Sequence, residues 1–212
     1  MPQNYKMKYL LVVLLHCCAL ATFAQDTKPA FDGHTWVSPY TLPTPKDWGI
    51  ERFPLPISFA PAIPYKGVED IRFSPGWGKA DSEEYWSYAF LWYLDGKIKM
   101  DARTIERNLK AYYTGLISVN GSKIPSEKLI PVVTTFKPIK KAKGDIKTFT
   151  GSVVMLDYME QKPITLNCKV HWRTCKGQNN TYIFYELSPQ AFSHQVWANL
   201  GQLWTGFKCD NK

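Results

Sequence analysis

The stretch NCKVHWRTC, residues 167–175, contains three side chains of types that catalyse reactions or bind metals: Cys168, His171 and Cys175. A thiolate beside a base can act as a nucleophile, and thiolates together with imidazole are common zinc ligands. Side chains alternate along a strand, however, so Cys168 and His171 should point to opposite faces. We therefore expect neither a metal site nor a catalytic cysteine here, and we expect no cofactor.

The parity of this strand also predicts the environment of Cys168. On one face it should have only apolar neighbours, namely Leu166, Val170 and Trp172. A thiol in such a place behaves as a small hydrophobic group. We expect Cys168 to be buried and unreactive.

Cys175 ends the same strand and should form a disulfide. The next strand, residues 181–187, is about 23 Å long at the usual rise. The predicted helix that follows it, residues 189–205, is about 25 Å long. A helix that folds back over its strand would therefore bring Cys209 to Cys175, and we predict this pair, with Cys168–Cys209 as the rival pairing.

Other catalytic signatures are absent from the sequence: it has no nucleophile elbow, no zinc-protease motif and no phosphate-binding or dinucleotide-binding glycine loop. Carboxylates remain, because a pair of them can perform acid–base catalysis when their environments separate their pKa values. The candidates lie just before or within predicted strands: Asp81, Glu83, Glu84, Asp95 and Asp157. Such residues are more commonly exposed loop acids than members of a catalytic pair.

A basic segment offers a contact surface. Five lysines lie on a predicted hairpin tip and its flanks: Lys137, Lys140, Lys141, Lys143 and Lys147. A solvated tip that discourages edge pairing is the simpler interpretation. The functional one is contact with an anionic envelope surface or polysaccharide, which salt would weaken.

The N-terminus indicates where the protein works. Residues 1–24 have the three parts of a secretory signal peptide: a basic start, an apolar run and small residues before a cleavage site after Ala24. The run is shorter than the roughly 20 residues of a membrane span. We expect an exported protein, periplasmic or secreted, with no membrane span after cleavage. The net charge of +8 is diffuse, so nucleic acid is not an expected partner.

Proline divides the remaining chain. Nine of the fifteen prolines lie between Pro29 and Pro75, where they exclude long helices and central strands. Residues 25–80 should form an extended arm, rich in proline and aromatic residues, that packs on the domain and includes short edge strands such as GIERF and EDIRF.

Residues 81–212 should form one α+β domain. YWSYAFLWYL, residues 85–94, is apolar on both faces and predicts a central strand. Asp101 should cap a helix that ends near Asn120-Gly121. Four strands joined by short turns follow, at 129–136, 147–160, 164–173 and 181–187, and then the terminal helix. The fold expected is an antiparallel β-meander sheet of about five strands with two helices packed on it.

This order of elements is similar to that of PsbP-like domains. It also resembles the Bet v 1-type ligand-binding fold, in which a meander is followed by a long helix. The resemblance is one of coarse topology and transfers no residues.

Together these features favour an exported, non-catalytic binding or accessory protein of the cell envelope. Its partners would be an envelope polysaccharide or an apolar small molecule. The alternative is a secreted hydrolase that uses carboxylates on an uncharacterised scaffold.

Overall fold

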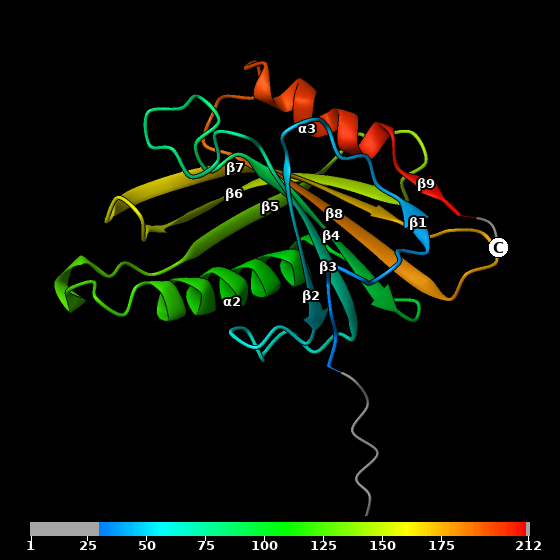
Figure 1. The fold of residues 1–212 in the computed structure, drawn as a ribbon, viewed down its shortest axis with the longest axis horizontal. Coiled ribbons are helices and arrows are strands. Elements are labelled where there is room, and N and C mark those ends of the chain that lie inside the picture. Colours follow the sequence, from blue (N-terminus) through cyan, green and yellow to red (C-terminus); the bar gives the residue numbers. More distant parts are fainter. Residues whose placement is uncertain (1–29, 211–212) are drawn as a thin grey trace, which may run out of the picture. The chain divides into compact units, whose positions relative to one another are not determined.

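The computed structural model describes residues 30–210, so the predicted signal peptide lies outside the described residues. One large antiparallel sheet has the strand order β2-β3-β4-β8-β7-β6-β5 (Figure 1). Its strands are β2 Gly49–Leu55, β3 Gly67–Phe73, β4 Tyr88–Asp95, β5 Val133–Ile139, β6 Lys147–Asp157, β7 Lys162–Arg173 and β8 Asn180–Ser188. A second, two-stranded sheet pairs β1, Tyr40–Thr41, with β9, Lys208–Cys209.

The helices lie on opposite faces of the large sheet. Helix α2, Ala102–Asn120, packs against β5 and β6, and α3, Val196–Thr205, packs against β8 on the other face (Figure 1). A single 3-10 turn, η1 Ser126–Lys128, follows α2. The α+β class with an antiparallel sheet and two helices is therefore confirmed. No helix within residues 30–210 has the length and apolar character that crossing a membrane requires.

Strand β4 is buried on both faces, as its sequence predicts. Phe90 and Trp92 belong to the core beneath α2, whereas Ala89 and Leu91 belong to the core beneath α3. All four are fully buried. The sheet thus separates two hydrophobic cores, because alternating side chains of one strand must fill both.

Helix α2 begins and ends where the sequence predicts. Asp101 is its N-cap, and the Thr104 amide donates to the Asp101 carboxylate over 2.7 Å. Such a bond satisfies one of the free amides of the first turn. Gly121 closes the other end by donating its amide to Ile117 O.

The sheet has seven strands rather than about five. The two additional strands, β2 and β3, contain GIERF and EDIRF, the segments that we expected to form short edge strands of the proline-rich arm. Proline lacks an amide donor, so within sheets it is confined to edge strands, strand ends and bulges. Pro54 accordingly lies in the edge strand β2, whereas β3 contains no proline and is an interior strand.

The terminal helix is shorter than predicted, because α3 begins at Val196 rather than at residue 189. The carbonyl of Gln190 accepts from the Asn167 side chain over 3.1 Å and from Trp197 Nε1 over 3.0 Å. These tertiary bonds occupy the acceptor that a longer helix would use, and residues 189–195 form turns instead.

Candidate functional site

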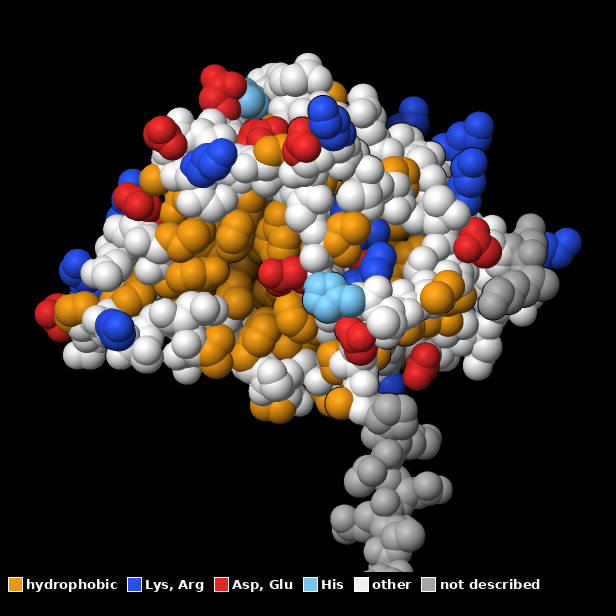
Figure 2. Space-filling view, viewed as in Figure 1, with side chains coloured by type: hydrophobic (Ala, Val, Ile, Leu, Met, Phe, Trp, Pro, Cys, Tyr) orange, Lys and Arg blue, Asp and Glu red, His pale blue; other side chains and the backbone are white. Residues whose placement is uncertain are grey.

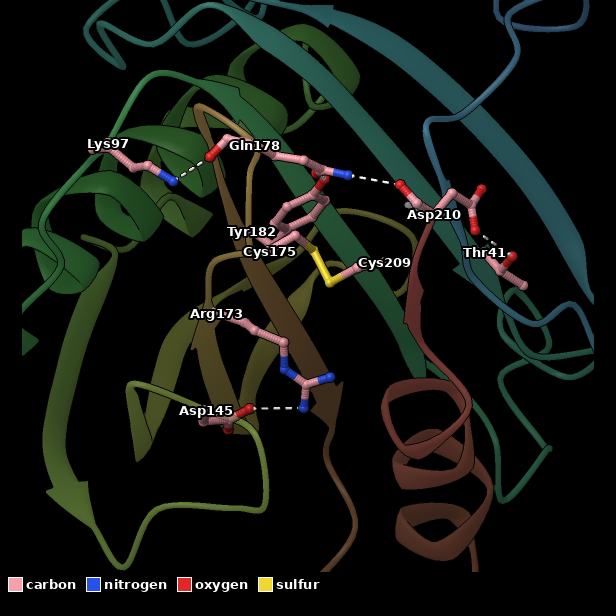
Figure 3. Close-up of a disulfide and its surroundings, with 9 residues drawn as sticks. All are labelled: Thr41, Lys97, Asp145, Arg173, Cys175, Gln178, Tyr182, Cys209 and Asp210. Atoms are coloured by element: carbon pink, nitrogen blue, oxygen red, sulfur yellow. Dashed lines mark hydrogen bonds and ion pairs between the residues drawn. A yellow bond between two sulfur atoms is a disulfide. The ribbon is translucent and has the colours of Figure 1, made fainter. Parts of the chain in front are cut away.

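The cysteines are arranged as strand parity predicts. Cys168 is fully buried in the core beneath α2, and this burial raises the pKa of its thiol. Cys175 and Cys209 form a disulfide with Cα atoms 5.8 Å apart (Figure 3). The C-terminal end of α3 therefore returns to the end of β7, and the rival Cys168–Cys209 pairing is wrong.

Hydrogen bonds reinforce this closure of the C-terminal end. Thr41 Oγ1 donates to the Asp210 carboxylate over 3.1 Å, and Gln178 Nε2 donates to the Asp210 carbonyl over 2.9 Å (Figure 3). The disulfide and the β1–β9 pair thus attach α3 both to the turn after β7 and to the N-terminal segment.

His171 lies on the α3 face of β7, opposite to Cys168, and contacts two acids. Its Nδ1 is 2.7 Å from Asp145 Oδ2, and its Nε2 is 3.2 Å from Glu186 Oε1. Burial alone would lower the pKa of His171, but the hydrogen bond to Asp145 and the nearby carboxylate of Glu186 outweigh it and raise the pKa above its ordinary value. The two carboxylates therefore favour the charged form of the imidazole.

Asp145 is the centre of this buried cluster. Besides His171 it accepts hydrogen bonds from Thr148 Oγ1 at 2.7 Å, Trp204 Nε1 at 2.9 Å and Arg173 Nη2 at 3.1 Å. The Arg173 guanidinium also lies 4.2 Å from the centre of the Trp204 ring. Asp145 thus joins the β5–β6 hairpin, strand β7 and helix α3.

A histidine bonded to an acid is a common feature of catalytic sites, but this one is closed to a substrate. His171 is only 6% exposed, and Trp204 of α3 packs on its ring, with centroids 5.5 Å apart. Asp145 and Glu186 are buried as well. The cluster fixes α3 to the sheet and is not an accessible reaction centre.

The remaining sequence candidates are dispersed. The five lysines of the β5–β6 hairpin are exposed, and their contact with an anionic surface stays a prediction. Asp81, Glu83 and Asp95 are exposed as well. Asp157 is buried, but it accepts from Tyr85 OH over 2.7 Å and from two amides of the following turn. The structure does not bring these acids together as a catalytic pair.

A cleft of about 690 Å³ lies between the sheet and the C-terminal half of α2. Figure 2 shows a hollow with hydrophobic walls on this face. Eight of its eighteen lining residues are aromatic: Phe53, Phe59, Phe73, Trp77, Trp86, Tyr88, Tyr112 and Tyr158. Strands β2 to β4, the loop of residues 74–87 and α2 supply most of the lining.

The rings hold one another in position. Phe73 lies 4.6 Å from Trp77 and stacks on Tyr88 at 5.8 Å. On the helix side, Phe59 meets Tyr112 edge to face at 5.2 Å. Stacked and edge-to-face contacts are the favoured geometries of aromatic pairs, so the walls are built to keep their shape without a ligand.

The backbone of the cleft is strained at two positions. Asp47 has φ 66° and Trp86 has φ 53°, and both line the cleft. Such left-handed conformations of residues other than glycine cost about 1–3 kcal/mol and tend to occur at functional sites. Trp86 is also fully buried, so the packing of its ring at the wall of the cleft holds the backbone in this conformation.

A buried acid lies directly behind the cleft. Glu69 of β3 accepts from Tyr112 OH over 2.8 Å and from Trp92 Nε1 over 2.9 Å. Burial raises the pKa of Glu69 to about 7; these two hydrogen bonds oppose the rise, and the charge of Glu51 adds to it. Glu69 therefore changes its charge near neutral pH.

We predict that Glu69 makes the protein less stable as the pH rises. The folded state binds this proton more tightly than the unfolded state, whose pKa is near 4.5. Between about pH 4.5 and 7 the free energy of unfolding should therefore fall, by about 3 kcal/mol in total. Urea unfolding on either side of this range measures the loss.

Glu69→Gln is the matching variant, because a neutral amide has the shape of the protonated acid. It should remove this part of the pH dependence, whereas Glu127→Gln at an exposed position should preserve it. An unchanged pH profile in Glu69→Gln would contradict the assignment.

Sequence reasoning did not identify Asp47, Glu51, Glu69 or Asp145. Each becomes notable only through partners that are distant along the chain. The aromatic richness of residues 36–94 was the one signal in the sequence that pointed to the cleft.

Comparison with known proteins yields no match: no family model, no curated protein and no solved structure is similar to the chain. Within residues 30–210, no group of three or more His, Cys, Asp or Glu side chains is placed to hold a metal ion.

Proposed function

We propose that the protein is an exported, non-catalytic binding protein that holds a small, largely apolar ligand in the cleft between the sheet and α2. The observation that carries this proposal is the aromatic cleft itself. Its volume of about 690 Å³ lies within the usual range of ligand pockets, about 300–1,000 Å³. Apolar walls with a few polar groups are also typical of such pockets.

The location of the cleft supports the same proposal. It lies on the α2 face of the sheet, whereas the disulfide and the Asp145 cluster brace the α3 face. The coarse resemblance to the Bet v 1-type ligand-binding fold points the same way, although here the cleft is bounded by α2 and not by the terminal helix.

The alternative function is a secreted hydrolase, and two observations bear on it. Two carboxylates, Asp47 and Glu51, line the cleft, and His171 is bonded to acids elsewhere in the fold. Asp47 and Glu51 are both exposed, however, and His171 is shielded by α3. The geometry therefore favours binding without catalysis.

The test uses the neutral fluorescent dye N-phenyl-1-naphthylamine as an apolar probe. We expect the wild-type protein to bind one molecule and to enhance its fluorescence. Gly78 lines the cleft, and a Cβ there would meet nothing within 4 Å, so Gly78→Phe adds a bulky side chain at the cleft without a clash at its Cβ. This variant should bind the dye about tenfold more weakly, or worse, a difference of about 1.4 kcal/mol.

Gly201→Phe is the matched control. Gly201 lies in α3, and a Cβ there also has open space around it. This variant should bind the dye as the wild type does. Absence of dye binding to the wild-type protein, or equal weakening in both variants, would refute the proposed site.

A further inference from the structure

The lining of the cleft has a charge pattern that differs from that of the whole chain. It contains two carboxylates, Asp47 and Glu51, and no lysine, arginine or histidine among its eighteen residues. The chain as a whole has a net charge of +8. An acidic cleft in a basic protein favours the entry of cations over anions.

Glu51 is on the α2 face of the sheet, where the cleft lies. It pairs directly with Ile71 of β3, and directly opposed residues of antiparallel strands share a face. On the same face, Phe53 pairs with Glu69, so the two glutamates are diagonal neighbours, about 7–8 Å apart in an ordinary sheet. The raised pKa of Glu69 is consistent with this arrangement, because the charge of Glu51 contributes to it.

The carboxylates of Asp47 and Glu51, called the rim carboxylates below, are not neutralised by the protein. Within residues 30–210, neither Asp47 nor Glu51 forms an ion pair with a basic side chain. Arg52, the neighbour of Glu51, pairs instead with Asp70, with Nε and Oδ1 3.0 Å apart. Both rim carboxylates thus remain available to a ligand.

The aromatic rings of the cleft also favour a positively charged ligand. A ring face is electronegative and attracts a cation that lies within about 6 Å of its centre. Quaternary ammonium groups benefit most, since they are weakly hydrated and are recognised by cages of rings. A primary ammonium is a compact, strongly hydrated charge, so it would lose more hydration on entering.

We propose that the ligand carries a quaternary or otherwise fully substituted ammonium group, held by the ring walls and by Asp47 and Glu51. This inference rests on the proposed binding function and adds the charge and chemical class of the ligand. An anionic ligand would face two carboxylates with no compensating cation in the lining, and it should be excluded.

A matched pair of probes tests the inference. Benzyltrimethylammonium is the cation, and neopentylbenzene is its neutral analogue with carbon in place of nitrogen. We expect the cation to bind the wild-type protein about tenfold more tightly, as one or two cation–π contacts with nearby carboxylates provide. Quenching of tryptophan fluorescence reports both affinities, because Trp77 and Trp86 line the cleft.

The double variant Asp47→Asn/Glu51→Gln keeps the shapes of both side chains and removes their charges. Its preference for the cation should fall to about threefold, the share left to the rings alone. Asp95→Asn/Glu127→Gln removes two exposed carboxylates that do not line the cleft and should keep the tenfold preference. In the wild type, raising the salt concentration from about 0.05 M to about 0.5 M should also reduce the preference.

The outcomes separate this inference from the proposed function. Equal affinity for the two probes would overturn the ammonium assignment while leaving a binding cleft in place. Equal loss of both probes in the double variant would also overturn it, because the carboxylates would then shape the cleft without sensing charge. Failure of both probes and of the neutral dye would refute the binding function itself.

Discussion

Replacing Asp145 with alanine is expected to lower the free energy of unfolding by about 3–5 kcal/mol, as the loss of one partner of a buried charged pair does. Asp145 is buried and accepts hydrogen bonds from four side chains on three elements. Without it, His171 and Arg173 lose their shared carboxylate, and Trp204 Nε1 loses its only acceptor in the described part of the chain. Buried groups left unpaired carry the full cost of desolvation.

Urea unfolding of three variants measures this contribution. Asp145→Asn keeps the size of the side chain and some of its hydrogen bonds, so it should cost less than Asp145→Ala. Lys143→Ala changes an exposed residue of the same hairpin and should alter stability by no more than about 0.5 kcal/mol. Similar values for Asp145→Ala and Lys143→Ala would mean that the cluster does not hold α3 to the sheet.

Removal of the Cys175–Cys209 disulfide is the second large effect. The bridge closes a loop with a sequence separation of 34. In the chain-entropy model, opening a loop of this length costs about 3–4 kcal/mol. The double variant Cys175→Ala/Cys209→Ala should therefore unfold at a markedly lower urea concentration than the oxidised wild type.

A reductant provides the control for this comparison. It should destabilise the wild-type protein by about the same amount and leave the double variant unchanged, since the remaining cysteine of the described chain, Cys168, is a buried free thiol. Equal stability of the oxidised protein and the double variant would show that the hydrogen bonds of Asp210 and the β1–β9 pair suffice to close this end.

Predictions from the sequence succeeded where local pattern decides the structure. The parity of residues 166–173 placed Cys168 and His171 on opposite faces, and the apolar character of residues 85–94 on both parities identified β4 as a central strand. Asp101 was recognisable as a helix cap for the same reason, because its partner, the Thr104 amide, is three residues away.

Predictions from the sequence failed where residues distant along the chain decide the structure. The start of α3 depends on Asn167, which binds the carbonyl of Gln190 from another strand. Proline content led us to expect only edge strands within residues 25–80, yet the proline-free β3 pairs with both β2 and β4 and is an interior strand. The aromatic content hinted at a ligand surface, but the position of the cleft could not be foreseen, because its walls come from strands, a loop and a helix whose register a single sequence does not reveal.

The position of β8 has a consequence for how the chain assembles. It is the last strand of the large sheet along the chain, but it lies at the centre, between β4 and β7. Until residues 180–188 are in place, β2-β3-β4 and β5-β6-β7 are two separate half-sheets with unpaired inner edges, a state prone to aggregation. Joining them requires contacts between residues far apart in the chain, so folding should be slow. A nascent or truncated chain that lacks β8 should therefore not form a smaller version of this fold.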